Sequence, residues 1–147
     1  MAQPIVLEKI LNIREQEKND AQIEKNKATD YFEKVANNLY YALKKKEQAE
    51  DGLHKYMQGK ATITKIKEQS LYIDAINKKI FTLQQQVQRA RTEMEALQVK
   101  LTDAHVEVKK VEKLIEKRKS DQLQLEQKLE KIEMDDISIR QFMNQNR

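Results

Sequence analysis

The strongest constraint on the fold is a run of apolar residues in the second half of the chain, spaced alternately three and four residues apart. Apolar residues at this spacing form one stripe along a helix, and several heptads in succession are typical of a left-handed coiled coil. We therefore expect the stripe to pack against another long helix. It occupies 13 successive positions: Ile73, Ile76, Ile80, Leu83, Val87, Ala90, Met94, Leu97, Leu101, Ala104, Val108, Val111 and Ile115.

The first third of the chain has the composition of the partner helix but a less regular pattern. Near the start, four apolar residues recur every 11 residues, a spacing that relaxes left-handed supercoiling: Ile10, Ala21, Phe32 and Leu43. Glu17 and Glu24 fall among the predicted core positions there and weaken this part of the contact. Further on, a heptad pattern interrupted by Lys46 includes Val35, Leu39, Ala42, Ala49, Leu53 and Tyr56.

The two glycines of the chain, Gly52 and Gly59, indicate where the first helix ends. Thr62 or Thr64 suits the N-cap of the following helix. We predict an all-α fold with a single coiled-coil domain over residues 1–147, consisting of a first helix at 5–57, a turn at 58–62 and a second helix at 63–134. The helices form an antiparallel hairpin, and the longer second helix extends beyond the first. A parallel homodimer is the structural alternative, but it does not explain the turn residues.

The stripe of the second helix breaks where the first helix should run out. Arg118 and Gln122 occupy core positions at that point. An apolar strip that the first helix cannot reach then follows, and unpaired apolar surface usually marks an interface. Asp135 and Asp136 predict a helix end, so that residues 135–147 form a separate C-terminal segment. The strip comprises Leu123, Leu125, Leu129 and Ile132.

The chain offers little for catalysis. It has no cysteine and only two histidines, His54 and His105, and it contains no glycine-rich phosphate loop and no nucleophile motif. We predict a protein that is not an enzyme and that has no catalytic, cofactor-binding or metal site. Residues 53–120 carry a net charge of +7, but acidic residues are interleaved along both helices, so we do not expect nucleic-acid binding. No stretch is long and apolar enough to span a membrane.

Three tyrosines are candidates for contacts with partner proteins. Tyr40 and Tyr41 adjoin Leu39, and Tyr72 adjoins Ile73, so each lies beside a predicted core position. Tyrosines on the flank of a coiled coil either anchor a partner or cover the edge of the core. The sequence leaves both readings open.

Each end of the chain has a distinctive segment. Residues 133–143 read Glu-Met-Asp-Asp-Ile-Ser-Ile-Arg-Gln-Phe-Met, and residues 7–18 form an amphipathic start. These two segments resemble the ending and the start of the flagellar export protein FliJ family of Gram-positive bacteria. Ile5, Val6 and Leu7 depart from the family, which often has phenylalanine there. The length and the glycine-containing turn also match.

This resemblance implies a non-enzymatic stalk, similar to the gamma stalk of rotary ATP synthases, for flagellum biogenesis, protein export and chemotaxis. The implied partners are the ring of the export ATPase, the cytoplasmic domain of the membrane export gate and the export chaperones. The implied location is the cytoplasm, peripheral to the membrane at the flagellar base. By resemblance, Tyr72 would face the gate, and the ATPase ring would contact Ile10, Ile13, Ile137, Ile139 and Phe142. Tyr40 and Tyr41 join Tyr72 as candidates for the gate or chaperones because of their positions beside the predicted core. The alternative is a generic coiled-coil chaperone or tether for apolar clients.

Overall fold

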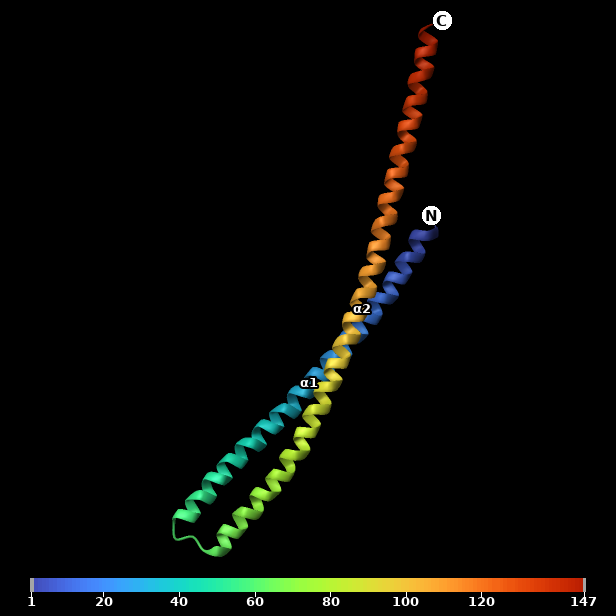
Figure 1. The fold of residues 1–147 in the computed structure, drawn as a ribbon. Coiled ribbons are helices and arrows are strands. Elements are labelled where there is room, and N and C mark those ends of the chain that lie inside the picture. Colours follow the sequence, from blue (N-terminus) through green and yellow to red (C-terminus); the bar gives the residue numbers. More distant parts are fainter. Residues whose placement is uncertain (1, 147) are drawn as a thin grey trace. The chain divides into compact units, whose positions relative to one another are not determined.

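The computed structural model describes residues 2–146. It consists of helix α1 (Ala2–Gln58) and helix α2 (Ile63–Gln145), joined by a short turn at residues 59–62 (Figure 1). The described residues contain no strand. The predicted all-α hairpin of two long helices packed on each other is confirmed.

Local hydrogen bonds explain where the helices meet the turn. The Gly59 amide donates to the Lys55 carbonyl at 3.1 Å, which closes the last turn of α1. The Thr62 hydroxyl accepts a hydrogen bond from the Lys65 amide at 3.3 Å, the contact that an N-cap side chain makes. Of the two threonines, Thr62 is therefore the cap. The predicted start of the second helix at Ile63 is confirmed, whereas the first helix runs from Ala2 to Gln58 rather than over 5–57.

The predicted end of the second helix at Met134 is wrong, because α2 continues without a break to Gln145. Aspartate has only modestly poor helix propensity, about 0.7 kcal/mol per residue, and no glycine or proline follows to stop the helix. Asp136 also faces Arg140 one turn later, at 3.8 Å. An exposed pair of this kind favours the helix slightly. Most of the predicted C-terminal segment is therefore part of α2.

The chain groups into two compact units, each formed by parts of both helices. Unit 1 comprises the described residues up to Lys18 and from Asp103 onward, and unit 2 comprises Asn19–Thr102. The assignment of the chain to one domain stays a prediction.

Unit 2 contains the best-packed part of the seam, by which we mean the line of contact between α1 and α2. Its core consists of small and aliphatic side chains, and Leu39 and Leu53 pack against it. On α2, every predicted stripe position from Ile73 to Leu101 is buried or half-buried, as predicted. The core cluster is formed by Ala42, Ala49, Ile73, Ile76, Ile80 and Leu83.

The seam of α1 is more regular than its sequence suggested. Ile10, Ala21 and Phe32 of the 11-residue spacing are buried or half-buried, but Glu24 is exposed and Leu43 and Tyr56 are 43% and 40% exposed, so the core positions predicted for these last three were wrong. Instead a strict heptad runs through unit 2, with lysines at two of its positions. Lysine fits there because its apolar stem packs while its ammonium group reaches water. The positions are Ala21, Lys25, Ala28, Phe32, Val35, Leu39, Ala42, Lys46, Ala49 and Leu53.

Polar contacts across the seam of unit 2 fix how the two helices face each other. The Gln69 side-chain amide donates to the Ala49 carbonyl at 3.0 Å. Gly52 allows this approach, because a Cβ atom there would lie 3.3 Å from Gln69 Nε2. Farther from the turn, Lys100 Nζ pairs with Glu24 at 3.1 Å. These pairs join residues that are far apart in sequence, as an antiparallel hairpin requires.

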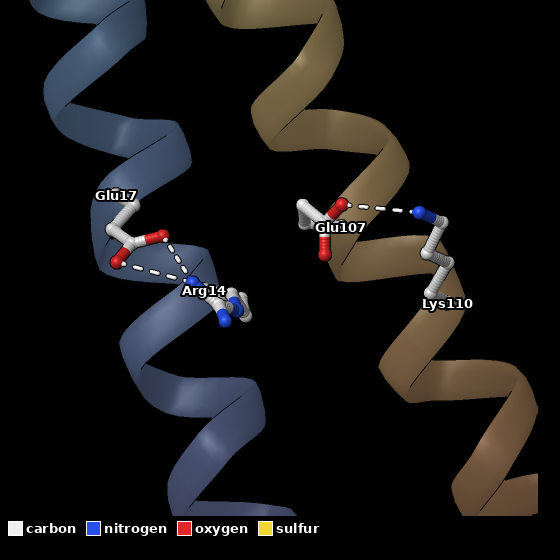
Figure 2. A network of polar contacts seen from close by, with 4 residues as sticks. All are labelled: Arg14, Glu17, Glu107 and Lys110. Atoms are coloured by element: carbon white, nitrogen blue, oxygen red, sulfur yellow. Dashed lines mark hydrogen bonds and ion pairs between the residues drawn. The ribbon is translucent and has the colours of Figure 1, made fainter.

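In unit 1, the seam is thinner. Val108 and Val111 of α2 are buried, but no residue of α1 between positions 5 and 18 is. Glu17, a predicted core residue, is exposed and pairs with Arg14 of its own helix at 3.0 Å. Figure 2 shows this pair beside the Lys110–Glu107 pair of α2, at 3.2 Å, each within one helix. The half-buried seam positions of α1 are Leu7, Leu11, Arg14 and Lys18.

Candidate functional site

One candidate surface is a groove along the seam of unit 2, where two of the predicted tyrosines meet. Tyr41 of α1 and Tyr72 of α2 form opposite walls of a groove of about 550 Å³. We call it the tyrosine groove, and it is lined by Asn38, Tyr41, Ala42, Lys45, Tyr72, Ala75, Ile76, Lys79 and Leu83.

The side chains of this groove combine an apolar floor with a basic rim. Ala42 and Ile76 are buried seam residues and form the floor, since alanine is too small to fill the space beside the larger residues of α2. Lys45 and Lys79 contribute two positive charges, and the lining contains no acidic residue. Tyr41 and Tyr72 are 61% and 51% exposed, so both rings are available to a partner. Chemically, the groove suits an acidic partner that carries an apolar side chain.

Tyr40 does not line the groove. Its ring packs edge-on against Tyr41 with the centroids 5.5 Å apart, and Lys44 lies over it at 5.7 Å. Tyr40 thus supports Tyr41 from the side. Of the three predicted tyrosines, the structure brings Tyr41 and Tyr72 together and places Tyr40 next to them. Sequence reasoning missed Lys45 and Lys79; the alanine at seam position 42 was the one clue to a hollow there.

The second candidate surface is the end of α2 in unit 1. Every described residue from position 116 onward is exposed. The three-and-four spacing of the seam nevertheless continues there, and its apolar members lie on one face of the helix. We call this face the distal strip, and it comprises Leu125, Leu129, Ile132, Ile139 and Met143, each between 56% and 64% exposed. Leu123 was predicted as part of the strip but lies on another face, because the two-residue offset between it and Leu125 corresponds to a rotation of about 200° around the helix.

The residues predicted to face an ATPase ring fall into separate groups. Ile10 is half-buried and Ile13 is 57% exposed on α1. Leu11, beside them, shares a shallow groove with Ile115 of α2. Phe142 lies 27 residues beyond Ile115, which corresponds to about 40 Å along the helix. The structure therefore does not bring the α1 and α2 residues together.

The three predicted residues near the C-terminus do not share one face either. Ile139 belongs to the distal strip, and Phe142 lies about 60° from it around the helix. Ile137 lies about 200° from Ile139. Ile137 is 47% exposed, Ile139 57% and Phe142 66%. A partner that grips all three must therefore surround the helix.

The described residues show no arrangement suited to catalysis. Within residues 2–146, no group of three His, Asp or Glu side chains is placed to hold a metal ion. His54 is exposed and contacts Gln58 of its own helix at 3.0 Å. In the part of the chain that the structure describes, no helix has the length and apolarity needed to cross a membrane.

Comparisons with known proteins agree with the family resemblance of the sequence. The family model described as "Flagellar FliJ protein" matches residues 3–147. The Flagellar FliJ protein of Bacillus subtilis (strain 168) is 32% identical over 145 residues, which cover 99% of each chain. No solved structure matches. The chain therefore belongs to the flagellar FliJ family and is a non-enzymatic component of flagellar protein export.

Proposed function

We propose that the protein is a coiled-coil stalk of the flagellar export apparatus, which engages the ring of the export ATPase and links it to the membrane export gate and to substrate chaperones. It acts at the cytoplasmic face of the membrane, held there by protein partners. One observation carries this proposal: the distal strip continues the spacing of the seam, yet no other part of the described chain covers it.

The distal strip supports binding to a ring because its apolar residues are available all along the end of α2. Five exposed apolar side chains on one face are more than a solvated helix needs, and contiguous apolar surface usually marks an interface. Ile137 and Phe142 add apolar groups on other faces of the same turns. A helix that enters the bore of a ring meets partner surface on every side, which suits this distribution.

The tyrosine groove supports a second contact, to the gate or to chaperones. It lies in unit 2, whereas the distal strip belongs to unit 1, so the two surfaces use different residues of α2. Exposed tyrosines beside an apolar floor are typical binding anchors. A stalk with two such surfaces can hold two partners at once.

The ATPase contact is tested with purified protein and its cognate export ATPase. The full chain should stimulate ATP hydrolysis, and deletion of residues 135–147 should weaken this stimulation. Ile139→Ala combined with Phe142→Ala should also weaken it, whereas Ile23→Ala combined with Val99→Ala, which removes two similarly exposed side chains from unit 2, should not. Unchanged ATP hydrolysis at saturating protein would refute the ring contact. Suppression of client aggregation without any dependence on the ATPase would favour the generic chaperone.

The gate contact is tested by the affinity of the full chain for the cytoplasmic domain of the export gate. Tyr72→Ala should weaken binding by about tenfold or more, the usual size of a tyrosine hot spot. Leu71→Ala is the matched control, since Leu71 is adjacent, 67% exposed and not part of the groove. Equal affinities of the two variants would exclude the tyrosine groove as the gate site.

A further inference from the structure

A second groove lies in unit 2, and neither the sequence patterns nor the family match pointed to it. We call it the glutamate groove, and it is lined by Glu24, Lys27, Ala28, Tyr31, Glu93 and Leu97. Like the tyrosine groove, it has a buried alanine of α1 and a leucine of α2 at its base and a tyrosine on its wall.

The two grooves are related by a shift of two heptads along both helices. On α1, Ala28 corresponds to Ala42 and Lys27 to Tyr41; on α2, Leu97 corresponds to Leu83. Each shift is 14 residues, which spans about 21 Å of helix. Because residues two heptads apart face the same way in a coiled coil, both grooves open on the same edge of the seam.

Small side chains contribute to both hollows. Ala28 and Ala42 are 9% and 5% exposed and leave space that a larger seam residue would fill. Val35 occupies the equivalent position between them and is 3% exposed. Between Ala28 and Ala42, one filled heptad therefore separates these two hollows.

The grooves differ in charge. Lys45 and Lys79 give the tyrosine groove two positive charges. The glutamate groove has two acidic residues and one lysine, a net charge of −1. Glu24 already pairs with Lys100 at 3.1 Å, so the carboxylate of Glu93 is the main attraction for a cation. With Lys100 counted, the charges at the glutamate groove balance, so the edge is positive at the tyrosine groove and close to neutral at the glutamate groove, where Glu93 is the carboxylate that a cation of a partner can meet.

From this spacing and charge, we propose that one amphipathic helix of a partner protein docks along this edge and fills both grooves. Its acidic end lies at Lys45 and Lys79, and its basic end lies at Glu93. This inference rests on the proposed use of the tyrosine groove and extends it to a second contact.

A helix fits the edge better than an extended peptide does. A third helix laid along a coiled coil has the same seven-residue period, so its residues 14 apart meet hollows that are 14 residues apart. Apolar side chains at those two positions enter the grooves, while flanking charges meet the lysines and Glu93. An extended strand rises about 3.3 Å per residue and alternates its side chains, which gives no such match.

The test uses the full chain and three designed amphipathic helices with identical apolar residues, measured by fluorescence anisotropy. One probe has glutamates at one end and lysines at the other; the other two have only glutamates or only lysines. The mixed-charge helix should bind about tenfold more tightly than either of the others, the scale expected from a few exposed charge pairs.

Charge-reversal variants locate the contact. K45E/K79E should weaken binding of the mixed-charge helix about tenfold and E93K about threefold, because attraction becomes repulsion in each case. The controls K67E/K78E and E95K carry the same changes on exposed residues that line neither groove and should leave the affinity unchanged.

Because the chain has no cysteine, a single fluorophore can be placed at K27C or at K45C. A quencher on the lysine end of the probe should quench position 27 more strongly than position 45. Equal quenching, equal affinity of the three helices, or no binding would overturn the inference. A loss with K45E/K79E but none with E93K would also overturn it and leave the tyrosine groove standing. Failure of the proposed gate contact appears separately, as equal gate affinity of the Tyr72 and Leu71 variants.

Discussion

Replacing Lys46 by leucine should stabilise unit 2, although it removes a charge from a highly charged helix. Lys46 occupies a seam position between Ala42 and Ala49, each of which is only 5% exposed. Its side chain is 35% exposed and its ammonium group lies 3.9 Å from Glu50, the geometry of a weak surface pair. A leucine at this position would make the seam of α1 apolar from Ala28 to Leu53.

The magnitude follows from the burial of the position. About two-thirds of a leucine would be buried there, worth about 1–2 kcal/mol. The lysine stem already contributes part of that burial, and loss of the pair with Glu50 costs about 0.3–0.5 kcal/mol. We expect the free energy of unfolding to rise by about 1 kcal/mol, which raises the urea midpoint by about 0.5 M for a chain of this size.

The assay is urea denaturation followed by circular dichroism, with Gln48→Leu as the control. Gln48 lies two residues away on the same helix and is exposed, so its change should stay within about 0.5 kcal/mol. A lower midpoint for the Lys46 variant, or an equal rise for the control, would refute the assignment of position 46 to the seam.

Two further predictions concern the helix ends. Thr62→Ala should lower the free energy of unfolding by about 1 kcal/mol in the same denaturation assay, because the Lys65 amide loses its cap. Thr64→Ala should change it little, and equal losses for the two variants would contradict the cap assignment. Ser138→Pro should abolish the helical NMR chemical shifts around position 138 but not those before Glu130, because α2 runs through this segment and proline costs about 3 kcal/mol inside a helix. Wild-type shifts that are already non-helical after Met134 would contradict the continuous helix.

The seam of α2 was predictable because its core residues from Ile73 to Ile115 are all apolar and follow the heptad spacing without a polar residue among them. The seam of α1 was predictable only in part, because Lys25 and Lys46 hold core positions with their stems and look polar in the sequence. Alanines add to the difficulty, since Ala21 and Ala28 carry little hydrophobic weight yet are among the most buried residues of the chain.

The candidate surfaces were likewise predictable from the sequence only in part. Tyr41 and Tyr72 could be singled out from their positions beside core residues, and the structure places them in one groove. The lysines of that groove and the whole glutamate groove could not, since a hollow depends on which side chains face each other across the two helices. The end of α2 was misjudged because two aspartates alone do not stop a helix of good helix formers.

The exposure of residues 116–146 also affects how tightly a partner can bind this end of α2. A helix without tertiary contacts is held only by local terms, and helix and coil interconvert in about 0.1–1 μs in segments of similar length. A partner that requires the helical form binds only that fraction of the population, and its apparent dissociation constant rises in inverse proportion to the fraction. Substitutions that touch no partner atom can therefore tune affinity at this end of the molecule, simply by changing how often the last turns of α2 are formed.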